Sequence, residues 1–138
     1  MQLLNLQNKK MGTFRDLTVY KKSFALAKDI YDISKSFPAD ELYGLTSQIR
    51  RSTRSVTVTI AEGYRKRRYE AHFISKISDS DMENTETQVW LEFALAFKFI
   101  NENLFNDLMG KSDEIGRMLH HMMEHPKKYI GDSEKMKN

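Results

Sequence analysis

Apolar residues recur at alternating steps of three and four positions between Asp16 and Phe37. This spacing matches the period of an α-helix and predicts an amphipathic helix over that segment. Pro38 follows directly, and the residue before a proline disfavours helical geometry, so we expect the helix to end near Phe37. The residues of the stripe expected to face the core are Leu17, Tyr20, Phe24, Ala27 and Tyr31.

The next segment, Leu45 to Tyr64, can be interpreted as a strand or as a helix. Between Thr53 and Ile60, Ser and Thr alternate with Arg, Val and Ile, as they do in strands. No other segment offers a partner strand, so we interpret it as a helix. At about 100° per residue, the residues that share one face of this helix are Leu45, Ile49, Thr53, Val56 and Ile60.

Two more helices are predicted in the second half of the chain, from about Tyr69 to Ile100 and from about Leu104 to His125. The expected buried residues of the first are Phe73, Ile77, Val89, Phe93 and Phe97. Those of the second are Leu108, Ile115, Met118, Leu119 and Met122. Four amphipathic helices with short connections predict an all-α, antiparallel up-and-down four-helix bundle. We place this domain at residues 13–126, between a flexible N-terminal tail (1–12) and a polar C-terminal tail (127–138).

The composition agrees with one helical domain, because the 138 residues include only 6 Gly and 2 Pro. The chain has no Cys, which excludes disulfides, zinc–thiolate sites and thiol catalysis and suits a reducing cytoplasm. The N-terminal residues lack the basic start and apolar run of a secretory signal. The densest apolar stretch, Val89 to Ile100, contains Glu92 and Lys98 and is too short to span a bilayer. We therefore expect a cytoplasmic protein that does not contact a membrane.

That apolar stretch covers more of its helix than the single stripe an isolated bundle can bury. Excess apolar surface predicts self-association. The alternative is a thick core around a long helix. The residues expected at the oligomer interface are Trp90, Leu91, Leu95 and Phe99.

Positive charge is concentrated in one segment. The chain carries a net charge of +3, but Gln48 to Tyr69 contains seven basic residues and one acid, Glu62, which gives 7 − 1 = +6. The planar guanidinium of arginine pairs two-pronged with phosphate oxygens, so this segment favours binding to RNA or DNA backbones. The alternatives are a solvated face paired with acids of other helices, or a docking surface for an acidic partner protein. The predicted nucleic-acid-binding residues are Arg50, Arg51, Arg54, Arg65, Lys66, Arg67 and Arg68.

Motifs for catalysis or cofactors are incomplete. Gly110 to Ser112 spell the end of a phosphate-binding loop, but Phe105 stands where that motif needs a glycine. His121 and His125 have a metal-ligand spacing without an evident third ligand. We therefore predict a protein without cofactor, metal or catalytic residues.

One catalytic alternative remains. Arg67 and His72 have the Arg-x4-His spacing that resembles the motif of the HEPN family of helical, metal-free ribonucleases. In that family the pair lies within a bundle helix, whereas Arg67 falls in a predicted turn. A metal-independent ribonuclease is accordingly kept as an alternative to a non-enzymatic protein.

Four segments carry a resemblance to a known family. They are FRDLTVYKKSFALAKDIYDISKSFP (Phe14 to Pro38), GLTSQIRRS (Gly44 to Ser52), SVTVTIAEGY (Ser55 to Tyr64) and ETQVWL (Glu86 to Leu91). The chain resembles the bacterial four-helix-bundle family named for proteins encoded inside intervening sequences of 23S ribosomal RNA genes. The resemblance implies a helical bundle throughout and a homopentameric ring. Its relatives include the accessory variability protein of diversity-generating retroelements, a basic pentamer thought to bind nucleic acid and a reverse transcriptase.

The chain departs from the family pattern at several positions. Thr57 replaces a common Pro, Thr59 an Asn, and Arg54 a small or apolar residue. Asp81 and Asn84 stand where Ser and Glu are usual. Arg54 adds to the basic face.

Overall fold

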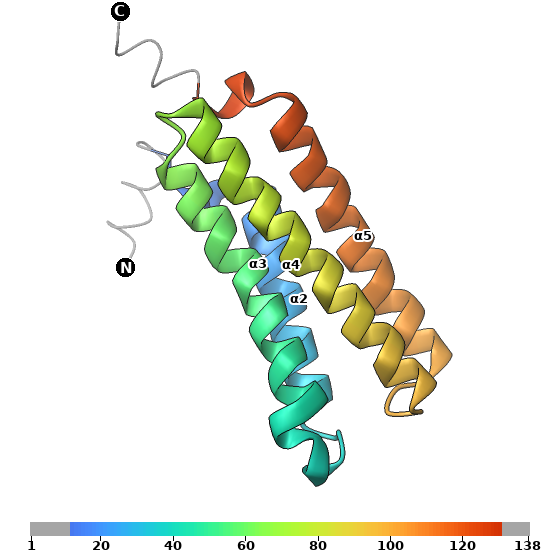
Figure 1. The fold of residues 1–138 in the computed structure, drawn as a ribbon. Coiled ribbons are helices and arrows are strands. Elements are labelled where there is room, and N and C mark those ends of the chain that lie inside the picture. Colours follow the sequence, from blue (N-terminus) through green and yellow to red (C-terminus); the bar gives the residue numbers. More distant parts are fainter. Residues whose placement is uncertain (1–11, 131–138) are drawn as a thin grey trace, which may run out of the picture.

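The computed structural model describes residues 12–130. Its four long helices are α2 (Thr18–Ser34), α3 (Ser47–Arg65), α4 (Glu70–Ala96) and α5 (Glu102–Glu124). Three short turns precede them: η1 (Phe14–Asp16) before α2, and η2 (Ala39–Glu41) and η3 (Leu42–Thr46) before α3. Successive long helices run in opposite directions, so the α2–α3 and α4–α5 connections lie at one end of the molecule (Figure 1).

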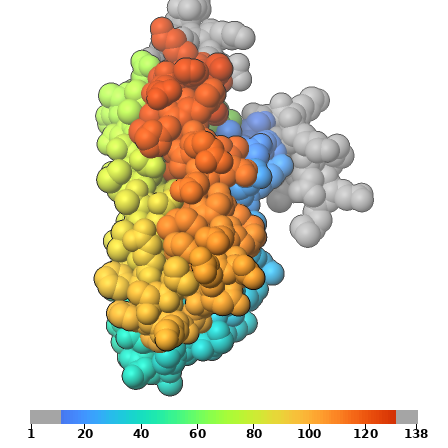
Figure 2. All heavy atoms as spheres, turned by 90° about the vertical axis from the view of Figure 1, so that its right-hand side faces the viewer, coloured from blue at the N-terminus to red at the C-terminus, as the bar shows by residue number. Residues whose placement is uncertain are grey.

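The helices form a closed square. α3 packs against α2 and α4, and α5 packs against α4 and α2. Figure 2 views the molecule from the α5 side, with α4 along one edge and α2 behind the other. The predicted all-α four-helix bundle is confirmed, and residues 12–130 contain no strand. None of the helices in this range is long and apolar enough to cross a membrane.

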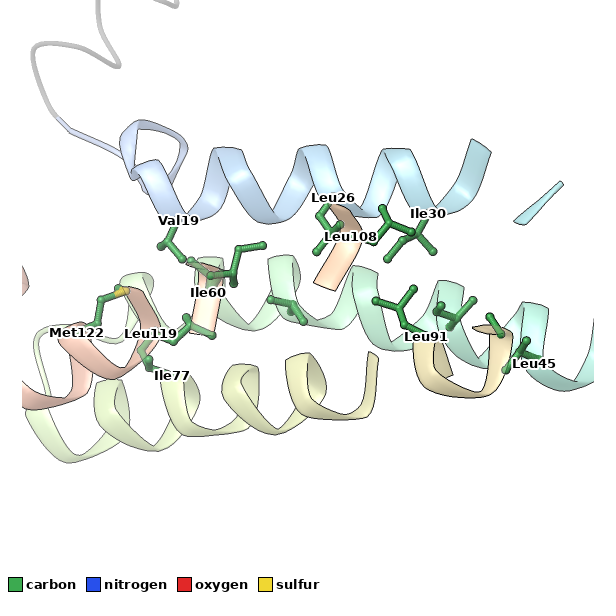
Figure 3. Close-up of a cluster of buried hydrophobic side chains, with 14 of the residues drawn as sticks. Val19, Leu26, Ile30, Leu45, Ile60, Ile77, Leu91, Leu108, Leu119 and Met122 are labelled. Atoms are coloured by element: carbon green, nitrogen blue, oxygen red, sulfur yellow. The ribbon is translucent and has the colours of Figure 1, made fainter. Parts of the chain in front are cut away.

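The core contains side chains from all four helices (Figure 3). α3 buries the predicted face, including Ile49, Val56 and Ile60, which confirms the helical interpretation of this segment. In α5 the predicted residues are buried as well, except that Met118 is half-buried. Among the largest fully buried side chains are Phe73, Ile77, Leu108, Ile115, Leu119 and Met122.

The predicted stripe of α2 is wrong in part: Leu17 and Tyr20 are half-buried against the core, but the rest of the stripe is not its buried face. Phe24 and Tyr31 are 56% and 42% exposed, whereas the face that enters the core carries Val19, Leu26 and Ile30. Two serines on that face, Ser23 and Ser34, are also buried. Each serine donates to a carbonyl one helical turn earlier, on Tyr20 and Tyr31 respectively, so its hydroxyl is satisfied without solvent. α2 therefore has two stripes of helical spacing, and Phe24 and Tyr31 of the aromatic one face outward.

The prediction for α4 is half right. Phe73 and Ile77 are buried, but the buried face then continues through Ser80, Asn84, Thr87, Leu91 and Ala94. Val89, Phe93 and Phe97 are 43%, 43% and 55% exposed, because they fall outside this face. Leu91, expected at an oligomer interface, is 1% exposed within a single chain and has no surface left for a partner.

Both ends of α5 differ from the expected boundaries. Asn101 is the N-cap of α5, and its side chain accepts a hydrogen bond from the backbone N–H of Leu104. After Pro126, the Tyr129 ring stacks on Phe73 at a centroid distance of 5.9 Å, and Ile130 is 3% exposed. Packing thus continues beyond the predicted domain end at residue 126. The predicted tails lie largely outside the described residues.

Candidate nucleic-acid interface

Two of the predicted arginines are held against one tyrosine of α2. Arg50 donates from Nε to the Ser34 hydroxyl at 2.7 Å, and its guanidinium lies 4.7 Å from the centre of the Tyr31 ring. The Arg54 guanidinium lies 6.0 Å from the same ring. Within residues 12–130, neither side chain has a carboxylate within ion-pairing distance. Both guanidiniums are thus positioned by neutral groups and keep their charge uncompensated.

Arg51 lies in a different environment. Its guanidinium forms ion pairs with Glu83 (3.3 Å) and Glu86 on α4, and these carboxylates raise the pKa of Arg51, first through the hydrogen bond from Arg51 to Glu83. The indole N–H of Trp90 donates to the same Glu86 carboxylate at 3.3 Å. Arg51 therefore connects α3 to α4, and any phosphate would have to compete with two acids for it.

The three arginines line one concavity on the outer side of α3, which we call the arginine hollow. Its volume is about 530 Å³. Leu42 and Tyr43 contribute to it from the η3 turn and Val58 from α3, so its lining mixes cations with apolar groups. The full lining is Leu42, Tyr43, Ser47, Arg50, Arg51, Arg54, Ser55 and Val58.

The other predicted basic residues form a separate cluster at the far end of α3. Arg65 ends the helix, where a cation interacts favourably with the helix dipole, and Lys66 to Arg68 form the turn into α4. Arg54 and Arg65 are about three turns apart, or about 16 Å along the axis, and lie on the same side of the helix. The seven residues thus form two separate patches, one in the hollow and one at the end of α3.

Arg67 and His72 contact different partners. The Arg67 guanidinium lies 4.0 Å from the centre of the Tyr64 ring and donates to the Tyr64 carbonyl at 3.0 Å. His72 lies beside the Tyr69 ring, at a centroid distance of 5.7 Å. Within one chain, Arg67 therefore packs on Tyr64 and His72 packs beside Tyr69, and the two side chains are not partners of each other.

The Gly110 to Ser112 segment and the His121/His125 pair contact other side chains of the bundle. Lys111 lies in α5 and pairs with Asp29 and Asp107, and buried Ser112 donates to Asn84 at 2.9 Å. The rings of His121 and His125 are 4.5 Å apart. Within the described part of the chain, no group of three or more His, Cys, Asp or Glu residues is placed to hold a metal ion.

Two further surfaces are apolar, and one of them, which shares Arg54 and Val58 with the arginine hollow, borders it. The first, the α2–α3 groove, has a volume of about 770 Å³ and contains the outward stripe of α2. The second, the α4 ridge, consists of the exposed side chains Val89, Phe93 and Phe97. Of the predicted interface residues, Trp90 packs against Phe93 (5.8 Å between ring centres), while Leu95 and Phe99 are half-buried against the core. The lining of the groove is Phe14, Tyr20, Phe24, Ala27, Lys28, Tyr31, Arg54, Thr57, Val58, Ala61 and Glu62.

Sequence reasoning missed the partners of the arginines. Leu42 and Tyr43, which line the hollow beside the arginines, were missed as well, because Leu45 of the same turn enters the core and spacing does not separate the three. Glu83 and Glu86 gave a weak sequence signal, because their spacing puts them on one face of α4. Which arginine of α3 they pair with depends on the register of the two helices. That register is set by packing and cannot be taken from spacing.

Comparison with known proteins identifies the family. No curated protein matches the chain. A crystal structure from Bacteroides thetaiotaomicron, described as a protein of unknown function from the S23 ribosomal protein family, is similar to it. The TM-score is 0.70, with 25% sequence identity, covering 77% of this chain and 95% of that chain. The family described as 23S rRNA-intervening sequence protein matches residues 15–121, a span that includes α2, α3, α4 and most of α5. The chain therefore belongs to the 23S rRNA-intervening sequence protein family.

Proposed function

We propose that the protein binds the sugar-phosphate backbone of nucleic acid through the arginines of α3. The observation that carries this proposal is the arginine hollow, where three guanidiniums from one helix line a single concavity. Arg50 and Arg54 are oriented by Tyr31 and Ser34 without a compensating carboxylate among the described residues. They can therefore pair with phosphate oxygens without first breaking an ion pair.

The second patch extends the proposed contact. Arg65 lies on the same side of α3 as Arg54, about 16 Å along the axis, and the Lys66 to Arg68 turn follows it directly. A polymer of regularly spaced phosphates can contact both patches, whereas a small anion can contact only one. This favours RNA or DNA over a mononucleotide. Binding through backbone phosphates releases counterions, so we expect affinity to fall steeply with salt.

The test compares charge removed from the hollow with charge removed elsewhere. We expect the double variant Arg50→Ala/Arg54→Ala to bind RNA and DNA more weakly. The slope of log affinity against log salt should become shallower by about 2, because each phosphate that the variant no longer binds reduces it by about 1. Fluorescence anisotropy with labelled oligonucleotides over a salt series measures both quantities.

Lys21→Ala/Arg117→Ala is the matched control. It removes two cations from α2 and α5, away from the hollow, and should leave the slope near that of the unchanged protein. If the Arg50→Ala/Arg54→Ala variant binds with the affinity and salt slope of the wild type, the proposal is ruled out. Intact RNA after prolonged incubation is expected as well, since the proposed role is binding without catalysis.

A docking surface for an acidic protein is the second candidate, and one contact favours it. Arg51 already pairs with two carboxylates, Glu83 and Glu86, so this face accepts carboxylate groups as well as phosphates. An acidic partner such as a reverse transcriptase would use the same arginines. The anisotropy assay separates the two: a protein that binds no oligonucleotide even at low salt leaves the acidic partner as the better candidate.

We further propose that the chain acts as a homo-oligomeric ring, for which the family resemblance implies five copies. The support is the pair of unlike apolar surfaces, the α2–α3 groove and the α4 ridge. Two different surfaces that fit each other produce a head-to-tail contact, which closes into a ring when the rotation between copies permits. Arg54 lines both the groove and the hollow, so it would stand at the edge of the contact between copies. Each copy would repeat Arg50 and the basic cluster at the end of α3, and multiple weak contacts would add as avidity.

A further inference from the structure

Tyr43 is the most exposed large apolar side chain of the described residues, at 92%. The other exposed aromatic side chains each have a ring or a cation beside them: Phe24 has Tyr20, Tyr69 has His72, and Tyr31 has the arginines. Within residues 12–130, no such neighbour is found for Tyr43. Its ring contributes nothing evident to folding and leaves both faces free for a ligand.

The position of this ring relates it to the proposed binding site. Tyr43 and Leu42 belong to the η3 turn, which leads directly into α3, and both line the arginine hollow. The same hollow is also lined by Val58, Ser47 and Ser55. Its lining thus offers a flat aromatic ring and aliphatic contacts beside the guanidiniums.

A nucleotide requires this combination. Its base has an apolar π-face that stacks on aromatic rings, and its phosphate pairs with guanidinium groups. In a duplex the faces of the bases are covered by their neighbours, so a protruding tyrosine cannot reach them. An unpaired base can turn outward and stack.

We propose, on the basis of the function proposed above, that the arginine hollow selects single-stranded nucleic acid by stacking an unpaired base on Tyr43. Arg50 and Arg54 hold the flanking phosphates, while Arg51 stays paired with its α4 carboxylates. Stacking tolerates any base, so the hollow distinguishes strandedness and not sequence. RNA and DNA single strands share this chemistry and both bind.

The experiment compares Tyr43→Ala with Tyr43→Phe in the full chain. The probes are a labelled single-stranded oligonucleotide, as RNA and as DNA, and a duplex of the same length. Loss of the ring should weaken single-strand binding by about 5- to 150-fold and leave duplex binding unchanged. Tyr43→Phe keeps the π-face and should bind single strands like the wild type.

A second readout reports stacking directly. A single-stranded probe containing 2-aminopurine, whose fluorescence is quenched by stacking, should be quenched by the wild type and by Tyr43→Phe but not by Tyr43→Ala. Circular dichroism establishes that each variant is folded. A merely structural role for Tyr43 would not produce this pattern.

Several results would overturn the inference. They are equal binding of single strands by Tyr43→Ala and wild type, equal weakening of single-strand and duplex binding, or a change in oligomer size without a change in binding. A wild type that binds duplex but not single strands would reject the stacking inference while leaving the proposed function standing. Failure of the Arg50/Arg54 variant to change binding would reject the proposed function itself.

Discussion

Lys98 has a backbone conformation that glycine would adopt at lower cost. It follows the last turn of α4 with φ = 63°, and the next residue, Phe99, donates its N–H to the Ala94 carbonyl at 2.8 Å. This pattern is a helix C-cap in which the left-handed residue is most often glycine. A side chain there strains the backbone.

Lys98→Gly should therefore stabilise the protein by about 0.5–1 kcal/mol, the relief of strain being partly offset by the greater freedom of glycine in the unfolded chain. Lys98→Ala removes the same charge but keeps a Cβ, and should give a smaller change. Urea unfolding followed by circular dichroism measures the free energy of unfolding. A Lys98→Gly variant no more stable than Lys98→Ala would contradict the argument.

Two glycines in helices provide an opposite pair of predictions. A Cβ on Gly63 would lie 3.0 Å from Ile77 Cδ1 and 3.1 Å from Lys76 Cβ, so α3 and α4 approach closely there. We expect Gly63→Ala to destabilise the bundle by about 1–3 kcal/mol through overpacking. A Cβ on Gly110 would meet no atom within 4 Å. Gly110→Ala should therefore stabilise the bundle by up to about 1 kcal/mol, because alanine favours the helix. Thermal unfolding of the two variants checks the signs, and equal shifts would refute the close approach.

The helices differ in how far their sequence predicted their packing. In α3 the predicted face is the observed one, because Ile49, Val56 and Ile60 form a single aliphatic stripe with arginines opposite. In α2 the sequence offered two stripes of equal spacing, and the aromatic one was chosen. The buried stripe includes Ser23 and Ser34, which accept hydrogen bonds from Thr57 and Arg50 of α3. Periodicity predicts that a helix has a buried face. When two faces have the same spacing, the neighbouring helices determine which one is buried.

Three of the five residues that depart from the pattern of the resembled family, Thr57, Asp81 and Asn84, have partners that spacing could not reveal. Thr57 donates to Ser23 at 3.0 Å, joining α3 to α2. Asn84 donates to the Ser112 carbonyl at 3.0 Å, and Asp81 contacts His120 at 3.2 Å, so both join α4 to α5. Each of these three polar residues therefore has its partner on a neighbouring helix. The arginine positions were predictable from charge, whereas these pairings required the assembled bundle.

At the scale of the whole molecule, the groove and the ridge predict how copies associate. We expect Phe24→Glu, which places charge in the α2–α3 groove, and Phe93→Glu, which places it on the α4 ridge, each to prevent the ring from forming. Neither residue lines the arginine hollow. Mixed in equal amounts, the variants should form a dimer and nothing larger if the proposed contact is right, because one variant keeps the ridge and the other keeps the groove.

Light scattering after size-exclusion chromatography gives the masses. If either variant dimerises by itself, like surfaces pair with like, and the head-to-tail arrangement is wrong. A wild type that is monomeric at micromolar concentration would remove the ring proposal altogether.

The turn after Pro126 packs on the bundle although it lies beyond the segment that matches the family. The family match ends at residue 121, yet Tyr129 covers Phe73 and Ile130 is buried. A chain trimmed to the matched span would lose this cover and expose Phe73 at one end of the bundle. A fragment that keeps this cover therefore extends through residue 130, nine residues beyond the matched span.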